Sequence, residues 1–170
     1  MEIVHYESED FRGIDVALLY QPKYLTVINS YPIHVPILNS KGEKIYTRQT
    51  LYVAGIMDGD TVHILVNHWP SRRGGSASDP LRIQAGIINR TVKDSILAVS
   101  PNAKVIVMGD LNDNPTDKSL TEGLKSVGKE KGIKADEMFN PFVSFYKKGI
   151  GTTAYQDAWS LFDQVIISPA

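Results

Sequence analysis

The sequence predicts an α/β protein built around a mixed sheet. Short apolar runs separated by turn residues are typical of strands, and several occur along the chain. One longer stretch, 80–98, has apolar residues at helical spacing and lies between two of these runs. The runs are apolar at nearly every position, so we expect other elements to cover both faces of the sheet.

The expected strands are bounded by residues that favour turns. Asp-Gly-Asp at 58–60 joins two apolar runs and is a strong hairpin signal. Pro32 and Pro36 lie in an extended stretch, which favours an edge strand or irregular pairing there. A turn or exposed loop is expected at 39–44. The expected strands are 14–20, 25–38, 50–57, 61–68, 104–108 and 160–168.

The principal helix is expected over 80–98. Asp79 is a suitable N-cap, and Pro80 suits the first helical position. We expect one apolar face, with three polar residues outside it. The apolar positions are Leu81, Ala85, Ile88, Val92 and Ile96, and the polar ones are Arg82, Asn89 and Lys93.

The second half of the chain has weaker signals. Asn114 and Pro115 open an expected second helix that runs to about Leu124. The stretch 126–151 is rich in lysine and glycine and has no clear periodicity.

Composition excludes several classes of protein. The 170 residues suit one domain, and 18 basic against 19 acidic residues give a net charge of −1, without the basic excess of many nucleic-acid-binding proteins. The absence of cysteine excludes disulfides and thiolate metal sites. No apolar run is long enough for a membrane helix, and the first residues lack the pattern of a signal peptide. A soluble protein of unknown compartment is expected, and a trimmed start would hide an export signal.

Polar residues gather where three expected strands meet one end of the sheet. His68 follows one strand, and Asp110 and Asn112 follow the next strand, with the 80–98 helix as the crossover between the two. Asp163 opens the last strand, and it reaches the same end if that strand runs antiparallel. A carboxylate beside Leu161, Phe162 and Val165 is costly when buried unless it is paired.

Each of these residues also has a structural explanation. His68 alone is more often a hydrogen-bonded structural histidine, and the acidic residues after 109 alone are more often a turn. Asp163 alone would be a strand-start residue or a structural ion-pair partner. A calcium loop is excluded because Pro115 stands where glycine is needed and Thr121 stands where a bidentate glutamate is needed.

The motifs together resemble a known family. "RGIDVALLY", "VNHWPSR", "MGDLNDNP" and "FDQVIIS", in this order, resemble the endonuclease/exonuclease/phosphatase superfamily of metal-dependent phosphodiesterases. The resemblance covers residues 1–170 as one domain. It implies a DNase I-like α/β sandwich with mixed, largely antiparallel sheets and flanking helices. It also implies hydrolysis of phosphodiester or phosphomonoester bonds in nucleic acid, phospholipid or inositol phosphate.

The resemblance implies a role for each matched position. Asp110 orients or deprotonates the attacking water, and Asn112 contacts the phosphate; both support a Mg²⁺ ion, or Mn²⁺ or Ca²⁺ in its place. His68 contacts the phosphate or the leaving oxygen, and Asp163 orients a histidine. Arg72 and Arg73 follow His68 and are placed to reach phosphate oxygens, although a solvated loop explains them equally well.

Two parts of the family pattern are missing. No metal-binding glutamate matches the family's motif ahead of Ile14, and no Asp-His pair follows Asp163. We therefore expect a central fragment of the domain, incomplete at both ends and weak or inactive as a hydrolase when alone. Open sheet surfaces would favour self-association. The alternative is a catalytically dead relative that binds a phosphate-bearing ligand or a protein.

Overall fold

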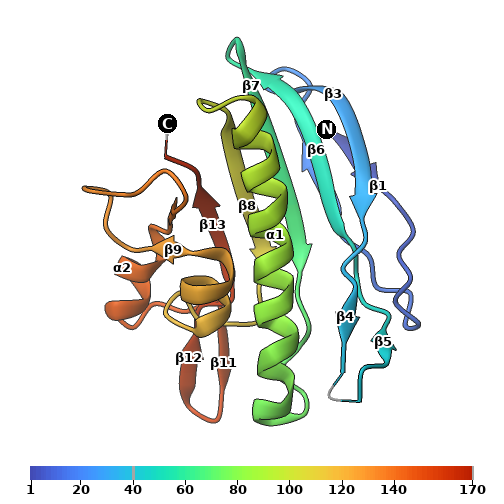
Figure 1. The fold of residues 1–170 in the computed structure, drawn as a ribbon, viewed down its shortest axis with the longest axis vertical. Helices are drawn as coiled ribbons and strands as arrows, with labels where there is room; N and C mark the ends of the chain where they lie inside the picture. Colours follow the sequence, from blue (N-terminus) through green and yellow to red (C-terminus); the bar gives the residue numbers. More distant parts are fainter. Residues whose placement is uncertain (40, 170) are drawn as a thin grey trace.

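A seven-stranded sheet forms the centre of the computed structural model, which describes residues 1–39 and 41–169 (Figure 1). The strand order is β3-β6-β7-β8-β13-β10-β9. β7 and β8 are parallel, as are β9 and β10, whereas all other neighbours are antiparallel. The strands are β3 (Thr26–Ile33), β6 (Thr50–Met57), β7 (Asp60–His68), β8 (Lys104–Asp110), β9 (Ser126–Val127), β10 (Met138–Phe139) and β13 (Asp163–Ile167).

Other elements cover both faces of the central strands, as the sequence predicts. Helix α1 (Asp79–Val99) lies across β7 and β8 on one face (Figure 1). Beneath it, Leu65, Val107 and Ile166 belong to the first apolar core. On the opposite face, the ribbon of β1 (Glu2–His5) and β2 (Ala17–Tyr20) packs Leu18 against a second core that includes Val53 and Ile64.

Short elements complete the fold at its periphery. β4 pairs with β5, and β11 pairs with β12, as two small antiparallel ribbons. The bounds are β4 (Ile37–Leu38), β5 (Lys44–Ile45), β11 (Thr153–Tyr155), β12 (Ala158–Ser160), the 3₁₀ turn η1 (Gly75–Ser78), the π-helical turn η2 (Ser119–Leu124) and α2 (Phe142–Lys147). No helix among the described residues has the length and apolar character needed to cross a membrane.

The predicted central strands are confirmed, whereas the bounds of the first predicted strand are corrected. β3 is an edge strand, as its proline indicates, and left-handed Asp58 and Gly59 form the predicted β6–β7 hairpin. The first predicted strand is shorter than 14–20, because Ser8 bonds the main chain of Ile14 and the carboxylate of Asp15 and holds this part as a loop. Ser40, within the predicted 39–44 turn, lies outside the described residues.

The predicted helix at 114–124 is wrong in its first half. Asp117 accepts a hydrogen bond from the N–H of Asn114 through Oδ2 at 2.7 Å, and its own N–H donates to the Asn114 carbonyl at 2.9 Å. These bonds make a turn of 114–117 and delay the helical turn to Ser119. The turn ends at left-handed Lys125.

Helix α1 has the predicted length, but its buried face differs from the predicted one. Arg82, Asn89 and Lys93, placed outside the apolar face by the sequence, are almost completely buried. Each has a polar partner: Arg82 Nε lies 2.8 Å from Asp113 Oδ1, Asn89 donates to Asn67 Oδ1 at 2.9 Å, and Lys93 donates to the Asp136 carbonyl at 2.8 Å. These partners are distant in sequence, so helical periodicity could not show them.

The predicted cap of α1 is also corrected. Ser78 occupies the N-cap position, and Asp79 is the first helical residue. The Asp79 carboxylate accepts a hydrogen bond from Arg82 at 2.5 Å instead of capping the helix.

Candidate active site

Three of the four expected catalytic residues lie in one row across adjacent strands. His68 pairs in register with Asp110 across parallel β7 and β8, and Asp110 pairs with Asp163 across antiparallel β8 and β13. Residues in register point to the same face of a sheet. We call this end of the sheet, where β7 and β8 end and β13 begins, the site end; it is the lower end in Figure 1.

His68 and Asp110 are close enough to interact electrostatically. His68 Nε2 lies 3.6 Å from Asp110 Oδ2, and both side chains are about one-third exposed. Partial burial lowers the pKa of His68 below its ordinary value and nearby Arg48 lowers it further, whereas Asp110 acts in the opposite direction. The imidazole is therefore neutral at pH 7.

Asp163 lies where the sequence predicts, but its carboxylate is not buried as its apolar neighbours in the sequence suggested. Its residue is exposed, so its neighbours Leu161 and Phe162 do not desolvate the carboxylate. Its main-chain N–H donates to Thr152 Oγ1 at 3.3 Å. The carboxylate is thus free to face solvent or a ligand at the site end.

The turn after β8 fixes Asn112 next to Asp110. The N–H of Asn112 donates to Asp110 Oδ1 at 2.9 Å, with Asn112 in the left-handed conformation. The Asn112 side-chain amide donates to the Trp69 carbonyl at 3.0 Å, which ties the ends of β7 and β8 together. Gly109 permits this approach, since a Cβ there would lie 2.0 Å from the Asn67 carbonyl oxygen.

Arg48 and Asp10 complete the site end, and the sequence did not point to either as a site residue. Arg48 donates to the main-chain carbonyls of His68 at 3.1 Å and Trp69 at 2.7 Å, and to Asp10 Oδ2 at 3.1 Å. Asp10 also pairs with Arg12, whose hydrogen bond holds the pKa of that carboxyl well below its usual range. Asp10 lies in a polar stretch, and Arg48 lies two residues ahead of the apolar run that begins at Thr50, so no local pattern in the sequence marks either residue.

The two expected phosphate-binding arginines have different surroundings. Arg72 donates to Asp117 Oδ2 at 2.5 Å, Asp113 Oδ1 at 3.0 Å and the Asn112 carbonyl at 2.9 Å, with its guanidinium over the Phe162 ring. Arg72 therefore braces the loop after β8.

Arg73 is exposed and has a different position. It lines a hollow of about 170 Å³ together with Arg12, Arg48 and Ser71. Asp10 also lines this hollow and pairs with Arg12 and Arg48, so Arg73 is the arginine of the three that is placed to meet a phosphate group.

Asp110 and Asn112 are the residues that could hold a metal ion. A carboxylate and an amide carbonyl are hard oxygen donors, and Mg²⁺ accepts such a small set because it keeps several of its waters. In the described part of the chain, the site end does not bring three His, Asp or Glu ligand atoms within 4.8 Å of one another. The donor set fits Mg²⁺ as a partial site.

Solved structures with a similar backbone fold define the fold class of this chain. The human Nocturnin catalytic domain is 14% identical with a TM-score of 0.66, covering 98% of this chain and 60% of that one. Danio rerio TDP2 complexed with a single-strand DNA product is 16% identical with a TM-score of 0.60, covering 99% and 62%. A Bacteroides thetaiotaomicron mannosyl-6-phosphatase is 15% identical with a TM-score of 0.59, covering 99% and 63%. The fold is DNase I-like, and the chain spans less than two thirds of each of these structures.

The model of the Endonuclease/Exonuclease/phosphatase family matches residues 1–170, and the chain belongs to this family. The predicted family and fold class are thereby confirmed. Members of the superfamily are phosphoester hydrolases. No match was found among curated proteins.

Proposed function

We propose that this chain hydrolyses phosphate esters at the site end of the sheet, with a divalent metal ion as cofactor. The observation that carries the proposal is the row of His68, Asp110 and Asp163 across three adjacent strands. Three polar side chains share one register row at the carboxyl ends of two parallel strands, where ligands of α/β sheets bind, and this supports a ligand site over separate turns. Family membership supports the same chemistry.

The metal would bind through Asp110 and the side-chain oxygen of Asn112. Members of the family generally depend on a divalent metal, and the hard oxygen donors favour Mg²⁺, with Mn²⁺ or Ca²⁺ as substitutes. When bound, the ion polarises phosphoryl oxygens and makes a water more acidic. Because so few donors from the described residues converge here, binding of the ion and turnover by the chain alone should both be weak.

Asp110 has two tasks in the proposed reaction, as a metal ligand and as the general base. The Asp110 carboxylate accepts the proton of the water that attacks phosphorus in line with the leaving oxygen. Neutral His68, 3.6 Å from Asp110, contacts the phosphate. Because it is uncharged, it adds no second positive charge beside the metal ion. Asp163 faces the same side as Asp110 and would orient a histidine, which is the role that the resemblance implies for it.

The hollow that Arg12, Arg48 and Arg73 line together with Asp10 would bind the phosphate, mainly through Arg73. Arg73 and Arg12 are exposed at its rim, whereas Arg48 lies buried at its wall. A single phosphate group matches this small volume, so either a phosphomonoester or one phosphodiester linkage fits. Nucleic acid, phospholipid, inositol phosphate and sugar phosphate are the substrate classes that share this group.

Hydrolysis of model esters tests the proposal. We expect slow, Mg²⁺-dependent release of nitrophenol from bis-p-nitrophenyl phosphate or p-nitrophenyl phosphate, at a rate far below that of a longer family member. The combined substitution Asp110→Ala and Asn112→Ala should bring it to the uncatalysed rate, since general-base catalysis alone contributes about 10²–10⁴-fold. The control Glu130→Ala alters an exposed acid outside the site end and should leave the rate unchanged.

A different result would favour the binding alternative. If the unsubstituted chain shows no Mg²⁺-dependent hydrolysis, yet phosphate raises its Tm and Arg73→Met removes that rise, the chain is a phosphate-binding relative without catalysis. Turnover equal to that of a longer relative would contradict the expectation of a weak site.

A further inference from the structure

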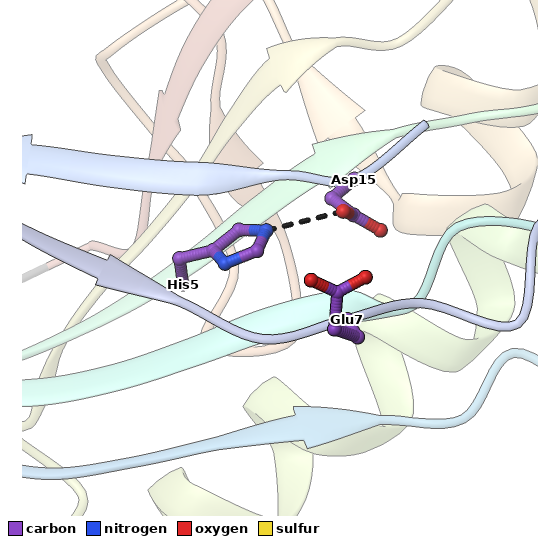
Figure 2. A group of neighbouring side chains, drawn as sticks. All are labelled: His5, Glu7 and Asp15. Atoms are coloured by element: carbon purple, nitrogen blue, oxygen red, sulfur yellow. Dashed lines mark hydrogen bonds and ion pairs between the residues drawn. The ribbon is translucent and has the colours of Figure 1, made fainter. Parts of the chain in front are cut away.

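A second group of metal-ligating side chains lies at the end of β1 and in the loop that joins β1 to β2, and it shares no residue with the site end. Figure 2 shows His5, Glu7 and Asp15 pointing toward one another. One ligand atom from each lies within 4.8 Å of the other two, and His5 Nε2 lies 3.1 Å from Asp15 Oδ2. None of the three belongs to the row of His68, Asp110 and Asp163.

The strand register explains why these side chains meet. Val4 pairs with Leu18, and both pack into the second core, so the neighbouring pair of His5 and Ala17 faces the other way. Beyond the strand ends the chain forms a loop, in which the Ser8 hydroxyl donates to the Ile14 carbonyl at 2.9 Å. This bond keeps the segment of Glu7 beside that of Asp15, so the cluster does not depend on flexible side chains alone.

The cluster holds two carboxylates and one imidazole. Oxygen atoms of Glu7 and Asp15 lie within 4.8 Å of each other, and like charges at this distance repel. Among the described residues, His5 is the only ion-pair partner of Asp15, and no lysine or arginine forms an ion pair with Glu7. A cation between the two carboxylates would remove this repulsion.

The Asp15 carboxylate is held in position for a ligand. Its Oδ1 accepts a hydrogen bond from the main-chain N–H of Ser8 at 2.8 Å, which leaves Oδ2 directed at His5. The side chain is only 18% exposed. Hydrogen bonds of this kind orient the ligands of metal sites.

We propose that His5, Glu7 and Asp15 bind a divalent transition-metal ion of the zinc class. Ligand atoms about 2.0–2.2 Å from a tetrahedral Zn²⁺ lie about 3.3–3.6 Å from one another. His5 Nε2 and Asp15 Oδ2 are hydrogen-bonded at 3.1 Å, so they need to separate only slightly when the ion takes the place of the proton. An imidazole beside two carboxylates selects Zn²⁺ over Mg²⁺, which prefers oxygen ligands alone. Water completes the coordination from the exposed side.

Calorimetric titration with Zn²⁺ in buffer that contains excess Mg²⁺ tests the site. We expect one equivalent of Zn²⁺ to bind, and His5→Gln or Glu7→Gln to weaken binding at least tenfold. His34→Gln is a matched control, because His34 and Glu9 form a similar pair, 3.5 Å apart, without a third ligand. This control should bind Zn²⁺ as the unsubstituted chain does, and circular dichroism verifies that each variant is folded.

Three outcomes would overturn the proposal. They are no saturable Zn²⁺ binding by the unsubstituted chain, binding that His5→Gln and Glu7→Gln leave unchanged, or binding that is lost in the Asp110→Ala and Asn112→Ala variant. The last would place the ion at the site end. The readout is metal binding and does not depend on hydrolysis, so it stands or falls separately from the proposed function.

Discussion

The guanidinium of Arg48 donates a hydrogen bond to the main-chain carbonyl of His68 at 3.1 Å. Arg48 also holds the next carbonyl, that of Trp69, and its side chain is only 3% exposed. The end of β7 is therefore fixed by a buried cation from a preceding segment. This positions the His68 backbone before any ligand arrives.

Replacing Arg48 by methionine should destabilise the protein strongly. The substitution removes the side-chain donor of the His68 carbonyl and one of the two donors of the Trp69 carbonyl, which keeps its bond from Asn112. It also removes one cation from the buried Asp10 carboxylate. Loss of one partner of a buried ion pair costs about 3–5 kcal/mol, and we expect the lower end because Arg12 still pairs with Asp10. Urea denaturation at pH 7 measures the free energy of unfolding. Lys125→Met breaks an exposed pair and should cost less than about 1 kcal/mol, and equal losses for the two variants would contradict this role of Arg48.

The lowered pKa of His68 makes stability depend on pH in a defined direction. The unfolded chain takes up a proton near pH 6.5, whereas folded His68 stays neutral to a lower pH. The free energy of unfolding should therefore fall as the pH drops below about 6.5. The contribution of His68 to this fall ends once His68 is also protonated in the folded chain. His68→Gln should reduce this slope. Part of the slope that remains should come from His63, because burial lowers its pKa as well.

Nuclear magnetic resonance offers a direct check of the same pair. Asp110 raises the pKa of His68, so Asp110→Asn should lower it further. Titration of the His68 ring signals measures both values. A pKa of His68 above 6.5 in the unsubstituted chain would refute the assignment.

Arg72 and Arg73 should respond differently to substitution by methionine. Arg72 binds Asp113 and Asp117, so Arg72→Met should lower the Tm by several degrees. Arg73 has no such contacts in the described residues, so Arg73→Met should keep the Tm and raise the KM for a phosphate ester or weaken phosphate binding. Calorimetry and ester hydrolysis separate these effects, and a KM change confined to Arg72→Met would reverse the assignment.

The exposed face of β13 leads us to expect self-association. Val165 and Ile167 are 36% and 40% exposed, beside the partly buried Ile106 and Met108 of β8. A second copy of the chain that covers this strip would bury its apolar surface. Light scattering should show dimers or larger species that Val165→Thr with Ile167→Thr reduces. A compact monomer at high concentration would count against the expectation.

Much of the fold could be predicted because its central elements have regular patterns. Strands β6, β7 and β8 and helix α1 are long, apolar and bounded by turn residues, so local signals suffice. The small ribbons and β9 and β10 are two or three residues long per strand, too short for a period to be visible. The buried face of α1 was missed because Asn89 and Lys93 bond to residues on other elements.

The candidate site was predictable to the extent that strand ends determine it. His68, Asp110 and Asp163 each adjoin an apolar strand, so topology alone brings them together. Arg48 and Asp10 belong to segments without regular structure, and their roles depend on contacts across the fold. The bracing role of Arg72 likewise follows from Asp117, far along the chain, which no local pattern connects to it.

The position of β13 has a consequence for the order in which the sheet assembles. β9 and β10 precede β13 in the sequence, yet they reach the rest of the sheet only through it. Pairing of β6, β7 and β8 uses near neighbours in the chain, whereas β13 must close long loops, which slows folding. During synthesis, His68 and Asp110 can meet early, but Asp163 joins them only when β13 inserts between β8 and β10.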